Sequence, residues 1–202
     1  MTTVTRDYDR VSMHGIRRSV LEAQVAELGL PLFEAPISPG ADNESYEQAF
    51  ASALAALRSE YPGVRHLAFG DLFLADVRAY RERLLSRLDW VPLFPLWGRD
   101  TNALATEFVR DGYRAILTCV DTTQLPASFA GREFDRSLLE DLPEGADWCG
   151  EQGEFHTCVY AGPIFREPLL VKLGERVRRD QRFEYCDLML RGSGASVPVT
   201  SL

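Results

Sequence analysis

The sequence predicts an α/β fold in which an open, mainly parallel β-sheet is flanked by helices and followed by a small β-rich part. Two observations predict it. Over the first two thirds of the 202-residue chain, short apolar runs alternate with helical patterns of about 10 to 15 residues. In the last third, the apolar runs follow one another directly. We therefore expect an α/β domain at residues 1–125, a C-terminal region with β-strands at residues 126–191, and a flexible tail at residues 192–202.

The elements of the first half can be bounded by their periodicity and by the residues that end them. Apolar residues recur at helical spacing up to Leu28, where Gly29 favours the end of a helix. Asp42 or Asn43 can cap the next helix, and Pro62 ends it. The expected elements are a strand at residues 2–5, a helix at 16–28, a strand at 30–37, a helix from residue 43 to before Pro62, a strand at 66–71 and a helix at 75–88.

The second half begins with one more strand and helix and then becomes β-rich. Asp100 or Thr101 can cap this helix, and Gly112 closes it. The expected elements are a strand at residues 90–94, a helix at 100–111, a strand at 113–120, a short helix at 134–142, and strands at 154–161, 169–173 and 182–190. We expect the strand at 113–120 to be the last of the parallel series.

The charge and composition of the chain exclude several classes of function. A net charge of -8 and a pI near 5.0 argue against a general nucleic-acid-binding surface. No apolar run reaches the roughly 20 residues that a membrane-spanning helix needs, and the N-terminus has no apolar segment typical of a secretory signal. We therefore expect a cytoplasmic protein that binds neither nucleic acid nor membrane.

The four cysteines do not predict a metal site. None forms a C-x-x-C pair, and none has the spacing of a structural zinc site. Cys149, His156 and Cys158 lie close together in the sequence, but without a second ligand pair small buried or loop thiols are the better interpretation. We expect no bound metal at the cysteines, and all four thiols reduced.

The candidate functional residues follow the predicted strands. In open parallel sheets, ligands bind beyond the carboxyl ends of the strands. Three polar segments follow strand ends, namely Gly70-Asp71, Trp97-Gly98-Arg99 and the stretch from Cys149 to Thr157. In the last stretch, Glu151 and Glu154 can act as acid, base or hydrogen-bond acceptor, and the glycines between them let a ligand approach the main chain. We expect the three segments to lie together.

Each candidate also has a purely structural interpretation. Asp71 can cap the helix that follows it, Trp97 can pack as an ordinary aromatic, and Arg99 can pair with Asp100 or Glu107. The arginines of the predicted helix at residues 75–88 can form a solvated face. For Glu151 and Glu154 the functional interpretation is the better one, because packing does not require two acids among glycines immediately before an apolar strand.

The motifs as a set resemble those of one family. Met13-His14-Gly15, Gly70-Asp71-Leu72, Pro95 to Arg99 and Cys149 to Thr157 occur in the same order and spacing as in the diphthine–ammonia ligase-like proteins. These proteins are also described as adenine nucleotide alpha hydrolase-like and are a branch of the PP-loop ATP-binding enzymes. The resemblance covers about residues 2–170, and the Trp-Gly-Arg motif together with Gly-Glu-x-Gly-Glu-Phe-His-Thr makes it specific.

The resemblance implies an ATP-dependent, AMP-forming amide ligase. In such an enzyme ATP, with Mg²⁺, adenylylates a carboxylate, and ammonia then displaces AMP. The resemblance implies catalytic roles for Glu151 and Glu154, and it implies that Gly150, Gly153, His156 and Thr157 bind the substrate. The residues that it places at the nucleotide are Met13, His14, Gly70, Asp71, Trp97, Gly98 and Arg99. The expected partner is a small-molecule or protein-borne carboxylate.

One departure from the family pattern bears on activity. Family members begin with a strand followed by Ser-Gly-Gly-Lys-Asp-Ser, a loop that holds the phosphates, and this sequence contains no such motif. The expectation is an N-terminally truncated fold that lacks the first strand and helix, with two strands left unpaired, weak ATP binding and an edge that would allow a homodimer. Two alternatives are a non-catalytic nucleotide- or metabolite-binding relative, and a metal-dependent hydrolase using Asp71, Glu151 and His156.

Overall fold

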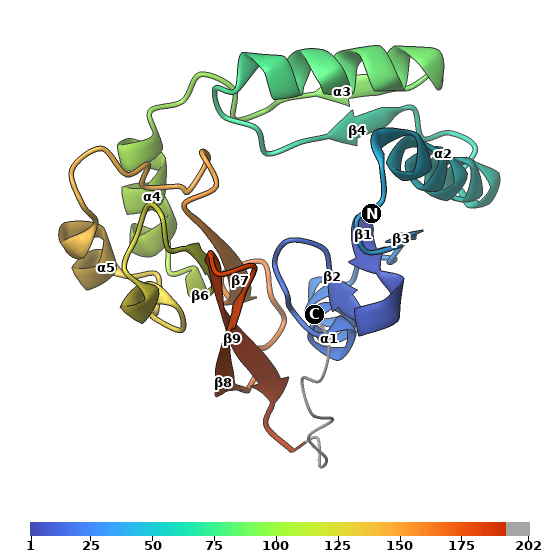
Figure 1. Cartoon of the computed structure of the whole chain (residues 1–202). Helices are drawn as coiled ribbons and strands as arrows, with labels where there is room; N and C mark the ends of the chain where they lie inside the picture. Colours follow the sequence, from blue (N-terminus) through green and yellow to red (C-terminus); the bar gives the residue numbers. More distant parts are fainter. Residues whose placement is uncertain (193–202) are drawn as a thin grey trace.

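The computed structural model describes residues 1–192 and contains three separate sheets (Figure 1). The first sheet has the order β2-β1-β3, with β1 parallel to β3 and antiparallel to β2. The second sheet is the parallel pair β4-β5, and the third is antiparallel with the order β7-β6-β9-β8. The strands are β1 Thr2–Thr5, β2 Arg10–Val11, β3 Glu34–Ile37, β4 His66–Ala68, β5 Val91–Leu93, β6 Arg114–Asp121, β7 Phe155–Ala161, β8 Val171–Arg179 and β9 Phe183–Leu190.

The helices begin and end close to the residues that the sequence indicates. The Asp42 and Asp100 side chains accept hydrogen bonds from the N–H groups of Ser45 and Ala103, and so cap α2 and α4. Gly29 adopts the left-handed conformation that ends α1. The α-helices are α1 Arg18–Leu28, α2 Asn43–Glu60, α3 Ala75–Arg87, α4 Thr101–Arg110 and α5 Arg136–Asp141. Short 3₁₀ turns lie at Arg6–Tyr8 and Ala127–Phe129.

The α/β class is confirmed, but the expected single open sheet is not present in the described residues. Parallel pairing is restricted to β1 with β3 and to β4 with β5. The prediction that the strand at residues 113–120 ends the parallel series is wrong, because β6 pairs antiparallel with both β7 and β9. The reason is burial: β6 is a central strand covered on both faces, and its apolar run therefore looks like that of a parallel strand.

The antiparallel sheet separates two hydrophobic cores. Successive residues of β7 point to opposite faces, so Phe155 and Val159 join the core beside α4 and α5, whereas Cys158 and Tyr160 join the core beside α1 and β1. Figure 1 shows α4 and α5 on one side of this sheet and α1 on the other. The functional side chains of β7 are therefore divided between two environments.

A third core lies between α2, α3 and the β4–β5 pair. Phe50, Leu54, Leu84, Leu85 and Trp90 form its buried part. In the described part of the chain β4 has β5 as its single strand neighbour, whereas the outer edge of β1 is covered by β2. β5 likewise has β4 as its single strand neighbour there, so this pair does not distinguish one strand edge as left unpaired.

Two further observations concern the chain as a whole. None of the helices within residues 1–192 is long and apolar enough to cross a membrane. The four cysteines, Cys119, Cys149, Cys158 and Cys186, are free. The expected flexible tail at residues 192–202 lies, apart from its first residue, outside the described residues.

Candidate functional site

The three segments that follow strand ends in the sequence meet at the backbone of Leu72. The Gly98 N–H donates to the Leu72 carbonyl oxygen at 2.8 Å, and the Leu72 N–H donates to Glu151 Oε1 at 2.7 Å. Leu72 itself is 3% exposed, so both bonds are anchored on a buried residue. The segments 70–72, 97–99 and 149–157 therefore form one junction, as the sequence predicts.

The acidic loop before β7 is held together by its own carboxylates. Glu154 is 2% exposed, and its two oxygens accept hydrogen bonds from the N–H groups of Asp147 at 2.9 Å and Gln152 at 3.0 Å. Asp147 Oδ1 in turn accepts from the N–H groups of Cys149 at 2.9 Å and Glu151 at 3.1 Å. The structure thus uses Glu154 to fix the loop. The sequence motifs do not include Asp147, although an aspartate whose side chain accepts from the N–H two residues later is the pattern of an Asx turn.

The two glycines of this loop differ in what surrounds them. Both have left-handed backbone angles, with φ of +69° at Gly150 and +83° at Gly153. A Cβ on Gly150 would lie 2.8 Å from the Phe155 carbonyl oxygen, whereas no other atom lies within 4 Å of a Cβ on Gly153. A side chain at residue 150 would therefore cause both backbone strain and a clash with the backbone of Phe155.

We expect Gly150→Ala to lower the free energy of unfolding by about 2 kcal/mol, and Gly153→Ala to lower it by about 1 kcal/mol. In both variants the alanine must adopt a left-handed backbone conformation. Only Gly150→Ala also requires the start of β7 to shift. Urea unfolding of the two variants side by side measures the difference. Equal losses would show that the contact with Phe155 carries no energy.

The candidates at residues 71 and 97 are engaged by arginines of α3. Arg81 Nε lies 2.7 Å from Asp71 Oδ2, and Arg78 lies over the Trp97 ring at 4.6 Å from its centroid. Asp71 does not cap α3, whose N-cap residue is Leu74. The interpretation of these arginines as a solvated face is incomplete, because Arg78 and Arg81 lie over aromatic rings.

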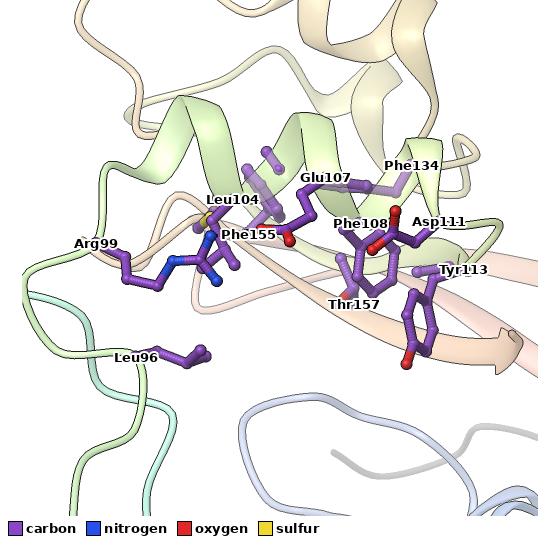
Figure 2. A pocket seen from close by; sticks show the side chains of 13 residues that line it. Leu96, Arg99, Leu104, Glu107, Phe108, Asp111, Tyr113, Phe134, Phe155 and Thr157 are labelled. Carbon is purple, nitrogen blue, oxygen red and sulfur yellow. Dashed lines mark hydrogen bonds and ion pairs between the residues drawn. The ribbon is translucent and has the colours of Figure 1, made fainter. Parts of the chain in front are cut away.

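A pocket of about 420 Å³ lies between α4 and the antiparallel sheet, and we call it the α4 pocket (Figure 2). Arg99 stands at one end and Tyr113 at the other (Figure 2). Arg99 forms an ion pair with Glu107, one of the two surface partners that the sequence offers. The lining residues are Leu96, Arg99, Leu104, Ala105, Glu107, Phe108, Asp111, Tyr113, Ala115, Phe134, Cys149, Phe155 and Thr157. The walls are therefore mostly apolar and aromatic, with the charged residues Arg99, Glu107 and Asp111 lying on α4 or beside its two ends.

His156 and Thr157 belong to opposite faces of the sheet. Thr157 lines the α4 pocket, whereas the His156 ring lies on the other face, with its centroid 4.7 Å from that of His14. Burial, and to a smaller degree the neighbouring His14, lowers the pKa of His156 to about 4. His156 and His14 are thus brought together from distant parts of the chain, but away from the α4 pocket.

The three residues of the metal-hydrolase alternative do not converge. Asp71 pairs with Arg81, Glu151 accepts from Leu72, and His156 lies beside His14. Within residues 1–192, no group of three or more His, Cys, Asp or Glu side chains could hold a metal ion. The geometry gives this alternative no support.

Comparison with known proteins points to one family. The model of a family described as "Diphthamide synthase C-terminal domain" matches residues 100–189. The chain is 34% identical to a diphthine--ammonia ligase of Danio rerio over 110 residues, which is 52% of this chain and 43% of that protein. It is 30% identical to that of Bos taurus over 129 residues, 61% of this chain and 48% of that protein. To that of Schizosaccharomyces pombe it is 22% identical over 198 residues, 92% of this chain and 32% of that protein.

These similarities confirm the resemblance that the motifs indicate. The family match includes α4, the acidic loop and all of the antiparallel sheet except the last residue of β9, so the α4 pocket lies largely within it. The chain spans less than half the length of the curated relatives it matches.

Proposed function

We propose that this diphthine–ammonia ligase-like chain binds the carboxylate-bearing substrate of an amide-forming ligase in the α4 pocket, with Arg99 holding the carboxylate. One observation carries the proposal: both motif segments that make the sequence distinctive line the same pocket. Leu96 and Arg99 come from one segment, and Cys149, Phe155 and Thr157 come from the other. A cavity of about 420 Å³ suits a small organic acid or an amino-acid side chain.

The chemistry of the pocket favours an amphipathic acid. The aromatic walls formed by Phe108, Tyr113 and Phe134 can bury an apolar body of the substrate. The side chain of Arg99 is 43% exposed, so its guanidinium stays accessible and can bind a carboxylate through two parallel hydrogen bonds. An incoming carboxylate would displace the Glu107 carboxylate from Arg99. This exchange keeps the guanidinium paired in both states.

ATP and Mg²⁺ are proposed from the resemblance alone, and the N-termini of α2, α4 and α5 do not fit a triphosphate. Within residues 1–192, no glycine-rich loop opens a helix in the manner of a phosphate-binding loop. Asp42, Asp100 and Asp135 occupy the N-termini of α2, α4 and α5, where their carboxylates would repel a phosphate. We therefore assign no reaction step to ATP in this part of the molecule.

A second candidate function is a non-catalytic relative that binds a nucleotide or metabolite without converting it. The acidic caps of α2, α4 and α5 favour it, because they oppose phosphate binding at these three helices while leaving the α4 pocket open to an organic acid. Both candidate functions use the α4 pocket, but only the ligase converts its ligand. Formation of AMP and an amide from ATP, ammonium and an organic acid would show that the chain is a ligase.

We expect Arg99→Gln to weaken binding of 4-phenylbutyrate by about 10- to 100-fold, because a charge-assisted hydrogen-bonded pair is lost. The neutral isostere 4-phenylbutanamide should bind the unchanged protein weakly and should be insensitive to this substitution. Isothermal titration calorimetry measures both ligands. Arg83→Gln, on the exposed surface of α3, is the matched control. Equal affinity for acid and amide, or an unchanged affinity in Arg99→Gln, would refute the proposal.

A further inference from the structure

Tyr113 closes the end of the α4 pocket that lies opposite Arg99 (Figure 2). The Tyr113 N–H donates to the Phe108 carbonyl oxygen at 3.2 Å, so its backbone is tied to α4. The two rings also stack, with their centroids 5.0 Å apart and their planes 20° from parallel. Phe108 therefore bounds the position of the Tyr113 ring from the side of α4.

Phe108 has little freedom to yield to its neighbour. Its ring meets the Phe134 ring edge to face, with the centroids 5.4 Å apart and an angle of 86° between the planes. Phe134 is buried, and its ring centroid lies 6.1 Å from that of Phe155 at the start of β7. Because protein interiors are close-packed, a displaced Tyr113 ring cannot be accommodated by moving Phe108 into the core.

Gly162 lies against the Cδ1 side of the Tyr113 ring. It directly follows β7, whose last residue, Ala161, pairs with Arg114. The Gly162 carbonyl oxygen accepts a hydrogen bond from the Phe165 N–H at 3.0 Å, so the backbone is held on both sides of the glycine. A Cβ at residue 162 would overlap with Tyr113 Cδ1 and would lie 2.8 Å from Cε1. The Tyr113 ring thus occupies the space that any other residue at this position would need for its side chain.

The contact between Gly162 and Tyr113 controls the free space at this end of the pocket. Tyr113 and Phe108 line the α4 pocket, whereas Gly162 does not. The backbone at residue 162 is held by the strand pairing before it and by the turn after it. A ring that is pushed away from residue 162 therefore moves toward the cavity. The absence of one side chain keeps this end of the pocket open.

We propose that Tyr113 is the specificity-determining end wall of the α4 pocket, and that Gly162 is the residue that positions it. The wall sets the maximum length of the apolar body in an acid whose carboxylate binds Arg99. Acids whose apolar body ends before Tyr113 are accepted, and longer ones are rejected. This inference rests on the proposed function, because the length is measured from Arg99.

A series of ω-phenylalkanoates of increasing chain length, from phenylacetate to 6-phenylhexanoate, tests the end wall in the intact chain. In the unchanged protein, each methylene that fits should raise the affinity about fourfold, because it buries more apolar surface. The first methylene that forces the phenyl ring of the ligand against Tyr113 should lower the affinity instead. Isothermal titration calorimetry locates this maximum of affinity, which we call the length limit.

Three variants should change the length limit in a defined way. Tyr113→Ala removes the wall and should move the limit to longer acids. Gly162→Ala should move it to shorter acids, and should weaken binding of the longest acid that the unchanged protein accepts by about tenfold. In the double variant the limit should equal that of Tyr113→Ala, because no ring remains for the new Cβ to displace. The control is Gly29→Ala at the end of α1, where a Cβ meets nothing within 4 Å beyond its chain neighbours, and it should leave the limit unchanged.

Urea unfolding of the same proteins supplies a readout that needs no ligand. The stability that Gly162→Ala loses should largely be retained when residue 113 is already alanine, because residues in contact show coupled effects. If Gly162→Ala alone does not fold, Tyr113→Ala and the double variant still locate the wall.

One length limit for all variants, a longer limit in Gly162→Ala, or additive losses of stability would each overturn the inference. The role of Arg99 is tested separately. An unchanged affinity in Arg99→Gln would refute the proposed function even if the length limits shift as expected. Conversely, a loss of affinity in Arg99→Gln with one common length limit would refute the end wall alone. If the unchanged protein binds none of the acids, both proposals are wrong.

Discussion

Replacing Asp187 by asparagine is expected to lower the free energy of unfolding by about 3–5 kcal/mol, the largest effect of any single change considered. Asp187 in β9 is 7% exposed and binds Arg10 at 2.9 Å and Arg17 at 2.6 Å. Burial alone would raise the pKa of this carboxyl, but the hydrogen bonds from Arg17 and Arg10 outweigh it and leave the pKa below its usual value. The substitution leaves two largely buried guanidinium groups without a counter-charge.

The same substitution should also loosen the loop that presents His14, because Arg10 and Arg17 flank that loop. Denaturant unfolding measures the stability change, and the NMR contact between the His14 and His156 rings measures the displacement. Glu140→Gln breaks an exposed ion pair with Arg136 and should change stability by less than about 0.5 kcal/mol. A similar small loss for both variants would show that the buried triad contributes no more than a surface pair.

Replacing Glu154 by glutamine is expected to lower the free energy of unfolding by about 2–4 kcal/mol. Both carboxylate oxygens accept backbone N–H groups, from Asp147 and Gln152, in a buried position. Glutamine replaces one acceptor with an NH₂ group, which must then face another donor. The charge that strengthens the remaining hydrogen bond is lost as well.

Glu151→Gln is the matched control for this prediction. The Glu151 side chain accepts a hydrogen bond from the N–H of Leu72, and the amide oxygen of glutamine can accept the same bond. We expect a loss of less than about 1 kcal/mol. Thermal and urea unfolding of the two variants give the comparison. If Glu151→Gln were the more damaging change, the assignment of Glu154 as the organiser of the loop would be wrong.

Local elements of this chain could be predicted from the sequence, whereas the arrangement of the strands could not. The ends of α2 and α4 follow from Asp42 and Asp100, because capping depends on residues within one turn. The pairing of β6 depends on β7 and β9, which lie up to about 70 residues further along the chain. Because β6 is buried on both faces, its sequence is a continuous apolar run like that of a parallel strand. The sequence of β6 therefore does not indicate that its neighbours are antiparallel.

The sequence could predict which segments form the candidate site, but it could not predict the role of each residue. The motifs at residues 70–72, 97–99 and 149–157 do lie together, yet sequence spacing cannot show that Glu154 binds its own loop. Strand alternation could have placed His156 and Thr157 on opposite faces, since consecutive residues of a strand point in opposite directions. The aromatic wall of the α4 pocket joins α4, β7 and the segments that precede β6 and α5, and only the fold brings them together.

The most direct test of the account is the crystal structure of the chain in complex with 4-phenylbutyrate. The account predicts that the carboxylate binds Arg99, that Glu107 moves from its ion pair, and that the phenyl ring lies between α4 and the antiparallel sheet against Phe108. A ligand bound elsewhere, or one bound in the pocket with its carboxylate turned away from Arg99, would contradict the assignment of this pocket as the substrate site.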